Sequence, residues 1–329
     1  MAVGDSDDLH QVGGSNNGKG NGLLLYYYHY SFYSQKVLMA LHEKKLDFKS
    51  HIVMIRKGEQ YQPWFLQINP RGEVPVLKDG VKIIPDSSRI IEYLEDNFSN
   101  GGSRRLVPLD MGPEVRQKVM HFRTILDQLP TGIITVGSFY HPELCHNPKP
   151  PFIKPVRKLM MAADENSCQK LKECAEKNPE HKAVLLQKAE FQEQKHKIVT
   201  SKEEYVKVLN TVDSVLTEVE TELGSHDQEK SDWWLCCEQF TVADISLAAL
   251  LERLKCLGLE HRFWIPHRPH LGKYFSRVQQ RDSYMASVPS GLSHLGEVAK
   301  MGYSLPLVMG SVAIAMVAIS ILLYVQRRR

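Results

Sequence analysis

The chain has 329 residues, with 41 basic and 38 acidic side chains and a formal net charge of +3. Charges this balanced and interleaved exclude the basic patch of a nucleic-acid-binding protein, so we expect no nucleic-acid partner. Without its two ends, the chain is long enough for two modest domains. Its six cysteines are expected to be reduced thiols, because the body of the chain is predicted to lie in the cytosol.

Residues 1–22 form a leader rich in Gly, Asn, Ser and Asp. This composition differs from that of a secretory signal or an Arg-rich transit peptide, so we predict a disordered leader. The run from Gly13 to Gly20 nearly matches a phosphate-binding loop. It lacks the Ser or Thr that should follow Lys19 and it precedes the first predicted strand, so we expect no nucleotide site there.

Residues 23–100 form the first predicted domain, in which short β-rich runs alternate with helical patterns. Strands are predicted at 23–28, 51–55, 74–77 and 81–84, and helices at 31–45, 62–68 and 86–98. The resulting order, βαβαββα, is that of a thioredoxin-like α/β domain.

Two motifs in this domain carry a family resemblance. Val74-Pro75 begins a strand and is a candidate cis peptide bond, because X-Pro bonds adopt the cis form at modest cost. Asp86-Ser87 begins a helix, where the N–H groups and the helix dipole suit a carboxylate. Residues 73–77 and 86–94 together resemble the N-terminal domain of soluble glutathione transferases.

The resemblance implies a glutathione site formed by Val74, Pro75, Asp86 and Ser87, with glutathione as a ligand or co-substrate. In the transferase fold, the kink at Pro75 leaves the N–H and C=O of Val74 free to pair with a peptide backbone. The helix start at Asp86-Ser87 would bind the γ-glutamyl carboxylate. An ordinary helix cap uses the same residue types, so both interpretations of Asp86-Ser87 stay open.

The same resemblance places a catalytic hydroxyl just after the first strand, at Ser31. A hydroxyl that donates to the glutathione sulfur stabilises the thiolate over the thiol. The alternative is that Ser31, or Ser34 one helical turn later, only caps the first helix. Tyrosine hydroxyls crowd the same turn and are weaker candidates, namely Tyr26, Tyr27, Tyr28, Tyr30 and Tyr33.

Residues 101–288 form the second predicted domain, which is all-helical like the C-terminal domain of the transferases. Apolar residues recur at helical spacing over 113–129 and 205–223. Thr241 and Asp244 form a capping-box pattern before a helix that is apolar almost all round and is therefore predicted to be central and buried. We assign this motif a role in folding and not in catalysis.

Several cysteines and histidines in this half invite other interpretations. His141, Cys145 and His146 mimic the spacing of metal ligands, but nearby prolines break the helix that would align them, so we expect no metal site. The adjacent Cys236 and Cys237 are a conceivable redox pair. Adjacent cysteines bridge awkwardly, and core packing is the preferred interpretation.

An insertion of about 145–200 interrupts the helical domain. It begins with a Pro-rich stretch at 148–151 and continues into Lys/Glu-rich helical sequence around 156–177 and 180–197. Because large apolar residues are sparse, we predict a mostly solvated helical loop. Two interpretations stay open, a tolerated surface insertion and a partner-binding arm.

Residues 307–325 carry no charge and are predicted to form a transmembrane tail anchor. About 19 residues at 1.5 Å each give a helix of roughly 28 Å, enough to cross the hydrocarbon of a bilayer. Residues 289–306 form an amphipathic linker. The flanking Lys300 and the arginines at 327–329 resemble tail anchors of the mitochondrial outer membrane, with the endoplasmic reticulum and the peroxisome as alternatives.

The whole architecture resembles the ganglioside-induced differentiation-associated protein 1 family. The matching stretches lie at 31–32, 34–37, 63–65, 72–76, 141–144, 234–236, 240–241, 243–244, 253–255, 257–258 and 268–269. The resemblance implies a mitochondrial outer-membrane protein with a cytosolic body, which affects mitochondrial fission, network shape and redox balance. The family's second hydrophobic stretch before the span is reduced here to the short run in 289–306.

Two functional hypotheses follow. The first is a membrane-anchored, transferase-like regulator of mitochondrial shape, which works through cytosolic or outer-membrane proteins and senses glutathione. The second is an active glutathione transferase that conjugates electrophiles at the membrane surface. Transferases usually dimerise, so a homodimer is also expected, although the insertion could obstruct the usual interface.

Overall fold

The computed structural model of the chain describes residues 10–12, 22–99, 104–226 and 232–289. The predicted span at 307–325 and nearly all of the linker at 289–306 lie outside these ranges. Within the described ranges, no helix is both long enough and apolar enough to cross a membrane.

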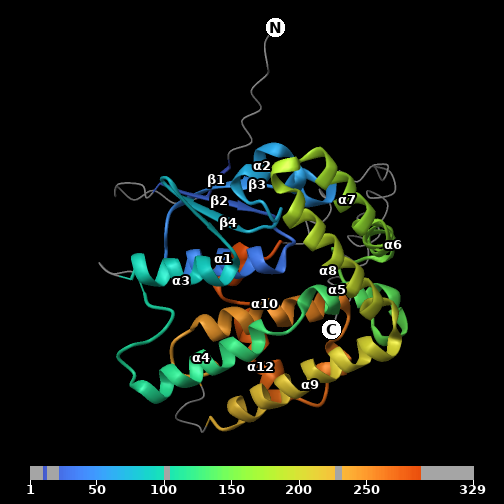
Figure 1. The fold of residues 1–329 in the computed structure, drawn as a ribbon. Coiled ribbons are helices and arrows are strands. Elements are labelled where there is room, and N and C mark those ends of the chain that lie inside the picture. The colour runs from blue at the N-terminus through green and yellow to red at the C-terminus, as the bar shows by residue number, and fades with distance from the viewer. Residues whose placement is uncertain (1–9, 13–21, 100–103, 227–231, 290–329) are drawn as a thin grey trace, which may run out of the picture. The chain divides into compact units, whose positions relative to one another are not determined.

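A five-stranded sheet organises the first domain (Figure 1). Its strands lie in the order β1-β3-β2-β4-β5, with β2 parallel to β3 and with the pairs β2–β4 and β4–β5 antiparallel. With the helices between them, β2 to α3 run in the predicted order βαβαββα. The bounds are β1 His10–Val12, β2 Leu23–Tyr27, α1 Phe32–Glu43, β3 Phe48–Ile52, α2 Pro63–Ile68, β4 Val76–Asp79, β5 Lys82–Pro85 and α3 Ser87–Asn97.

The leader differs from the prediction at three residues. Residues 10–12, expected to be disordered with the rest of 1–22, form strand β1 and pair antiparallel with β3. Without this pairing β3 would be an edge strand, and an edge strand offers unpaired backbone N–H and C=O groups to any neighbouring segment.

The two faces of the sheet pack into different cores, because successive side chains of a strand point to opposite faces. Leu23 and Leu25 of β2 belong to the large core that also contains α1, α3 and the helical half of the chain. Tyr26 packs on the other face against a small cluster with Phe65 of α2 and Val76 of β4. The helix α2 is therefore separated by the sheet from α1 and α3.

The second domain is helical as predicted, and its central helix is α10. Nearly every residue of α10 is buried, and Thr241 and Asp244 form the predicted capping box at its start. The domain comprises α4 Pro113–Asp127, α5 Thr131–Tyr140, α9 Lys202–Gly224, α10 Val242–Leu257, α11 Glu260–Phe263, α12 Pro269–Val278 and α13 Asp282–Ser287. Short 3-10 turns lie at Ile55–Lys57, Glu59–Tyr61, Pro142–Leu144 and Pro179–His181.

The insertion contains three helices, α6 Lys154–Glu165, α7 Ser167–Lys177 and α8 Lys182–Thr200. Its helical character is as predicted, and few residues of α7 and α8 are buried, as expected of a mostly solvated segment. These two helices form a hairpin with a small apolar core, and that core includes Leu66 of α2. Figure 1 shows the α7–α8 hairpin alongside α2.

Candidate functional site

The strand register brings the predicted site residues to one end of the sheet. Val76, the first residue of β4, pairs with Tyr26 on one side and with Pro85 on the other. Val74-Pro75 therefore lies between the end of β2, which leads to Ser31, and the end of β5, which leads to Asp86-Ser87. The three motifs are separated along the chain, and the position of β4 between β2 and β5 places them together.

The backbone of Val74 is available at this end of the sheet. The Val74-Pro75 peptide bond is cis, as predicted. The ladder of β4 begins only at Val76, and no hydrogen bond within the described ranges uses the N–H or C=O of Val74. Backbone groups left unpaired beside a strand can pair with an extended peptide.

Asp86 and Ser87 form the start of α3, as both interpretations of this motif require. Asp86 has φ 75°, which is unusual for a residue other than glycine. Its Oδ1 accepts hydrogen bonds from the backbone N–H groups of Ser88 and Arg89 at 2.9 and 3.1 Å. Asp86 is thus a helix cap, and the other carboxylate oxygen, Oδ2, makes no hydrogen bond with the described residues.

Ser31 is the N-cap of α1, and Ser34 lies behind it. The Ser31 Oγ accepts a hydrogen bond from the Ser34 N–H at 3.3 Å. Since the hydroxyl acts as the acceptor in this bond, its own proton is free to be donated to a ligand atom. Ser34 is fully buried and its Oγ accepts from the Tyr28 N–H at 3.3 Å, so its hydroxyl supports the turn.

Of the five tyrosines of this turn, Tyr33 is the most exposed, at 43%. Desolvation raises the pKa of its hydroxyl, and Thr131 at the start of α5 partly opposes this shift. Burial likewise raises the pKa of Tyr26 and Tyr27. A raised pKa favours the protonated phenol, so these side chains can donate a hydrogen bond but are poor bases near neutral pH.

The helical domain braces both helix starts of the site. Lys36 of α1 makes a buried ion pair with Asp127 of α4 at 2.6 Å. Arg123 of α4 donates to the Ser88 carbonyl at 3.3 Å and pairs with Glu92 of α3 at 3.0 Å. These contacts hold α1 and α3 against α4, so the site depends on both domains.

A buried arginine reaches the turn of Ser31 from the central helix. Arg253 of α10 is 9% exposed and donates to the Tyr30 carbonyl at 2.8 Å and to Thr135 Oγ1 at 3.2 Å. Residues 30 and 253 are 223 positions apart in the chain. No local sequence pattern could have shown that an α10 side chain supports the turn that carries Ser31.

The residues with metal-like spacing have structural partners. His141 is buried and its Nε2 lies 3.0 Å from the Val199 carbonyl, whereas the His146 ring contacts that of His261. In the part of the chain that the structure describes, no group of three or more His, Cys, Asp or Glu side chains could hold a metal ion. Cys236 and Cys237 are buried free thiols whose pKa is raised by desolvation.

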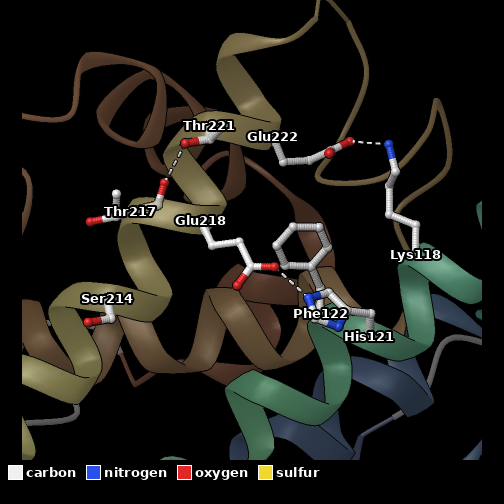
Figure 2. Close-up of a pocket in the computed structure, with 8 residues that line it drawn as sticks. All are labelled: Lys118, His121, Phe122, Ser214, Thr217, Glu218, Thr221 and Glu222. Atoms are coloured by element: carbon white, nitrogen blue, oxygen red, sulfur yellow. Dashed lines mark hydrogen bonds and ion pairs between the residues drawn. The ribbon is translucent and has the colours of Figure 1, made fainter.

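A separate cavity of about 470 Å³ lies between α4 and α9. Figure 2 shows two interactions across it, an ion pair of Lys118 with Glu222 and a hydrogen bond between the His121 ring and Glu218. Burial opposes ionisation of Glu222, but the side chains of His226 and Lys118 together lower its pKa. The lining includes none of the residues at the end of the sheet, so this cavity is distinct from the candidate site.

Family models match both domains. Residues 25–103 match the glutathione S-transferase N-terminal domain, and residues 189–277 match the glutathione S-transferase C-terminal domain. Human ganglioside-induced differentiation-associated protein 1-like 1 is 32% identical to this chain over 268 residues, which are 80% of this chain and 72% of the human protein. The chain belongs to the ganglioside-induced differentiation-associated protein 1 family. The mouse protein of the same name is also 32% identical, over 271 residues.

Solved structures show the same fold. The beta-etherase LigF from Sphingobium sp. strain SYK-6 has a TM-score of 0.58 and 25% identity, and the match covers 80% of this chain and 98% of LigF. A glutathione transferase family member from Pseudomonas fluorescens pf-5, solved with two glutathione bound, has a TM-score of 0.54 at 15% identity over 82% of this chain and 94% of its own. The chain thus has the glutathione transferase fold, and α6 and α7 fall between the two matched domains.

Proposed function

We propose that this family member binds glutathione at the end of the sheet formed by Val74, Pro75, Asp86 and Ser87. We further propose that it is a glutathione-responsive regulator of mitochondrial fission, network shape and redox state. This glutathione proposal depends on one observation. No described residue forms a hydrogen bond with the backbone of Val74, which lies beside the start of α3.

The chemistry of glutathione fits these groups one by one. The backbone of its cysteine would pair with the N–H and C=O of Val74, as an added strand does. Its γ-glutamyl carboxylate would accept from the Ser87 N–H and hydroxyl, since the first N–H groups of a helix have no intrahelical acceptor. Its γ-glutamyl ammonium would lie near the Oδ2 of Asp86.

Calorimetric titration of the full-length protein with glutathione tests this site. Replacement of Ser87 by Ala should weaken binding about tenfold, because a carboxylate loses a charge-assisted hydrogen bond. Ser214→Ala, at an exposed serine of α9, is the matched control and should leave the affinity unchanged. Failure of the wild-type protein to bind glutathione, or equal binding by both variants, would refute the proposed site.

A second function, conjugation of electrophiles, is favoured by one observation. The Ser31 hydroxyl at the start of α1 accepts from the Ser34 N–H and keeps its own proton for a ligand sulfur. If the wild-type protein conjugates glutathione to a reactive aryl halide and Ser31→Ala does not, the protein is an active glutathione transferase. Glutathione binding without turnover would favour the regulator.

The membrane proposal is supported by the sequence of residues 307–325, which is uncharged and long enough for a bilayer. Its basic flanks favour the mitochondrial outer membrane, and the proposed partners are cytosolic or outer-membrane proteins. Deletion of residues 307–329 should release a tagged protein from mitochondria into the cytosol. Mitochondrial residence of the truncated protein, or residence of the full chain in the endoplasmic reticulum or peroxisomes, would contradict the proposal.

A further inference from the structure

The α7–α8 hairpin contacts the turn that precedes Val74. Lys188 of α8 donates from its Nζ to the Arg71 carbonyl at 2.7 Å and lies 3.4 Å from the Gly72 carbonyl. The same ammonium lies 3.1 Å from Oε1 of Glu73. The Lys188 side chain is only 14% exposed, so these interactions are partly shielded from water and are stronger than those of an exposed lysine.

Apolar packing holds the hairpin in this place. Leu66 of α2 is fully buried in a cluster with residues of α7 and α8, namely Leu171, Ala175, Leu185 and Ala189. The Cys174 thiol of α7 lies 3.6 Å from the Tyr61 carbonyl, and Lys188 Nζ lies 5.4 Å from the centre of the Tyr61 ring. The hairpin thus contacts the N-terminal domain on both sides of α2.

The turn itself has little freedom. Gly72 has φ +58°, and a Cβ at this position would lie 2.7 Å from the Tyr61 ring. Asn69 donates from Nδ2 to the Glu73 carbonyl at 2.8 Å and accepts from the Arg71 N–H at 3.2 Å. The ammonium of Lys188 donates to the carbonyls of Arg71 and Gly72, and the Asn69 side chain donates to the carbonyl of Glu73. Val74 is therefore the residue at which backbone groups become available to a ligand.

We propose that Lys188 is a positioning residue for glutathione binding, through which the α7–α8 hairpin holds the turn at residues 69–73 in the shape that presents Val74. This inference rests on the proposed function, because it assigns the insertion a role at the same site. A displacement of α8 from this turn would lower the affinity for glutathione without any change in the residues that contact the ligand.

The test compares Lys188→Met with Lys197→Met in the full-length protein. Methionine keeps most of the apolar stem and removes the ammonium. Lys197 is on the same helix and makes an exposed ion pair with Glu193, so it is a matched control. Amide hydrogen exchange of the ligand-free protein reports on the turn, calorimetry reports on glutathione affinity, and thermal unfolding shows whether each variant is folded.

We expect Lys188→Met to speed exchange at residues 69–76 about tenfold and to weaken glutathione binding by a similar factor, with unchanged exchange in α10. Lys188→Arg should recover part of both losses, and Lys197→Met should change neither. For a Lys188→Met protein that does not fold, Glu73→Gln gives a smaller change of the same kind. It removes the ion pairs of Glu73 with Lys188 and with the exposed Arg71, but it keeps the hydrogen bond of Lys188 to the Arg71 carbonyl.

Unchanged exchange in the turn would overturn the inference, as would faster exchange with unchanged glutathione affinity. A wild-type protein that binds no glutathione would refute the proposed function separately. Because exchange is measured without ligand, it would still decide whether Lys188 holds the turn.

Discussion

The helical body and the inserted α7–α8 hairpin obtain their stability in different ways. In the body, α10 is buried on almost all sides and α9 contributes six buried residues to the same large core. In the hairpin, α7 buries only Leu171 and Ala175, and α8 buries three residues of nineteen. A helix pair with so little apolar surface cannot form a core alone, so it depends on Leu66 of the N-terminal domain and on the contacts of Lys188 of α8 with the turn there.

The polar contacts of the helical body are also more deeply buried than those of the hairpin. Asp244 is fully buried at the start of α10 and accepts hydrogen bonds from Leu235 N–H, Thr241 and Tyr274 at 2.8 Å each. Lys188 makes its contacts at the rim of the hairpin and remains 14% exposed. Loss of the first network should affect the whole fold, and loss of the second should affect one turn.

The largest effect is expected from Asp244→Ala. This change leaves the Leu235 and Thr241 N–H groups and the Tyr274 hydroxyl without their buried acceptor, so we expect a loss of roughly 3–5 kcal/mol in the free energy of unfolding. Denaturant unfolding followed by circular dichroism measures it. Glu203→Ala, at an exposed residue of α9, is the control, and equal midpoints for the two variants would contradict the structural role of the capping box.

A pair of leucine truncations separates the two regions. Leu209 of α9 and Leu185 of α8 are both fully buried, but Leu209 belongs to the large core and Leu185 to the small cluster of the hairpin. Leu209→Ala should lower global stability by about 2–5 kcal/mol because of the cavity it creates. Leu185→Ala should hardly move the global midpoint but should make α7–α8 susceptible to brief proteolysis. Equal shifts of the global midpoint would show that the hairpin unfolds together with the body.

The smallest effect concerns Tyr140, where the body meets the insertion. Its hydroxyl lies 3.5 Å from the Met161 carbonyl of α6, and burial, together with Asp164, raises its pKa to about 12. Because the pKa is raised, the protonated Tyr140 hydroxyl contributes to the stability of the fold. This stability is fully present below the ordinary pKa of 10.0 and is lost as the pH rises through about 12.

Tyr140→Phe should therefore lose this contribution at pH 7, about 0.5 kcal/mol after allowance for solvent screening, and should show a correspondingly smaller loss of stability at alkaline pH. Unfolding midpoints of the variant and of the wild type at pH 8 and pH 11 measure this difference. An identical loss of stability at alkaline pH in both proteins would mean that Tyr140 has the same pKa in the folded and the unfolded protein, which would contradict the prediction.

Much of the fold could be predicted from local patterns. The order βαβαββα, the capping box at Thr241 and Asp244 and the apolar helix behind it depend on neighbouring residues, and the structure contains all of them. The helices of the insertion were also predictable from composition. Their packing was not, because Leu66 and Leu185 meet across a long separation in the chain and no periodicity relates them.

The candidate site divides in the same way. The motifs at Val74-Pro75 and Asp86-Ser87 are short and local, so their residue types alone indicated a strand start and a helix start. The supports of the site, Arg253 behind Tyr30 and Lys188 on the turn of Arg71, were missed. An isolated basic residue on a helix is usually solvated, and only its neighbours in space distinguish it from the others.

The amino-acid sequence by itself determined which segments form strands and helices, where the helices begin, and which family the chain resembles, since these depend on side chains a few positions apart. Only the tertiary structure decided that the insertion reaches the turn before Val74. Lys188 and the carbonyls it binds are 116 and 117 positions apart, and such a contact follows from how the helices pack and not from any local pattern.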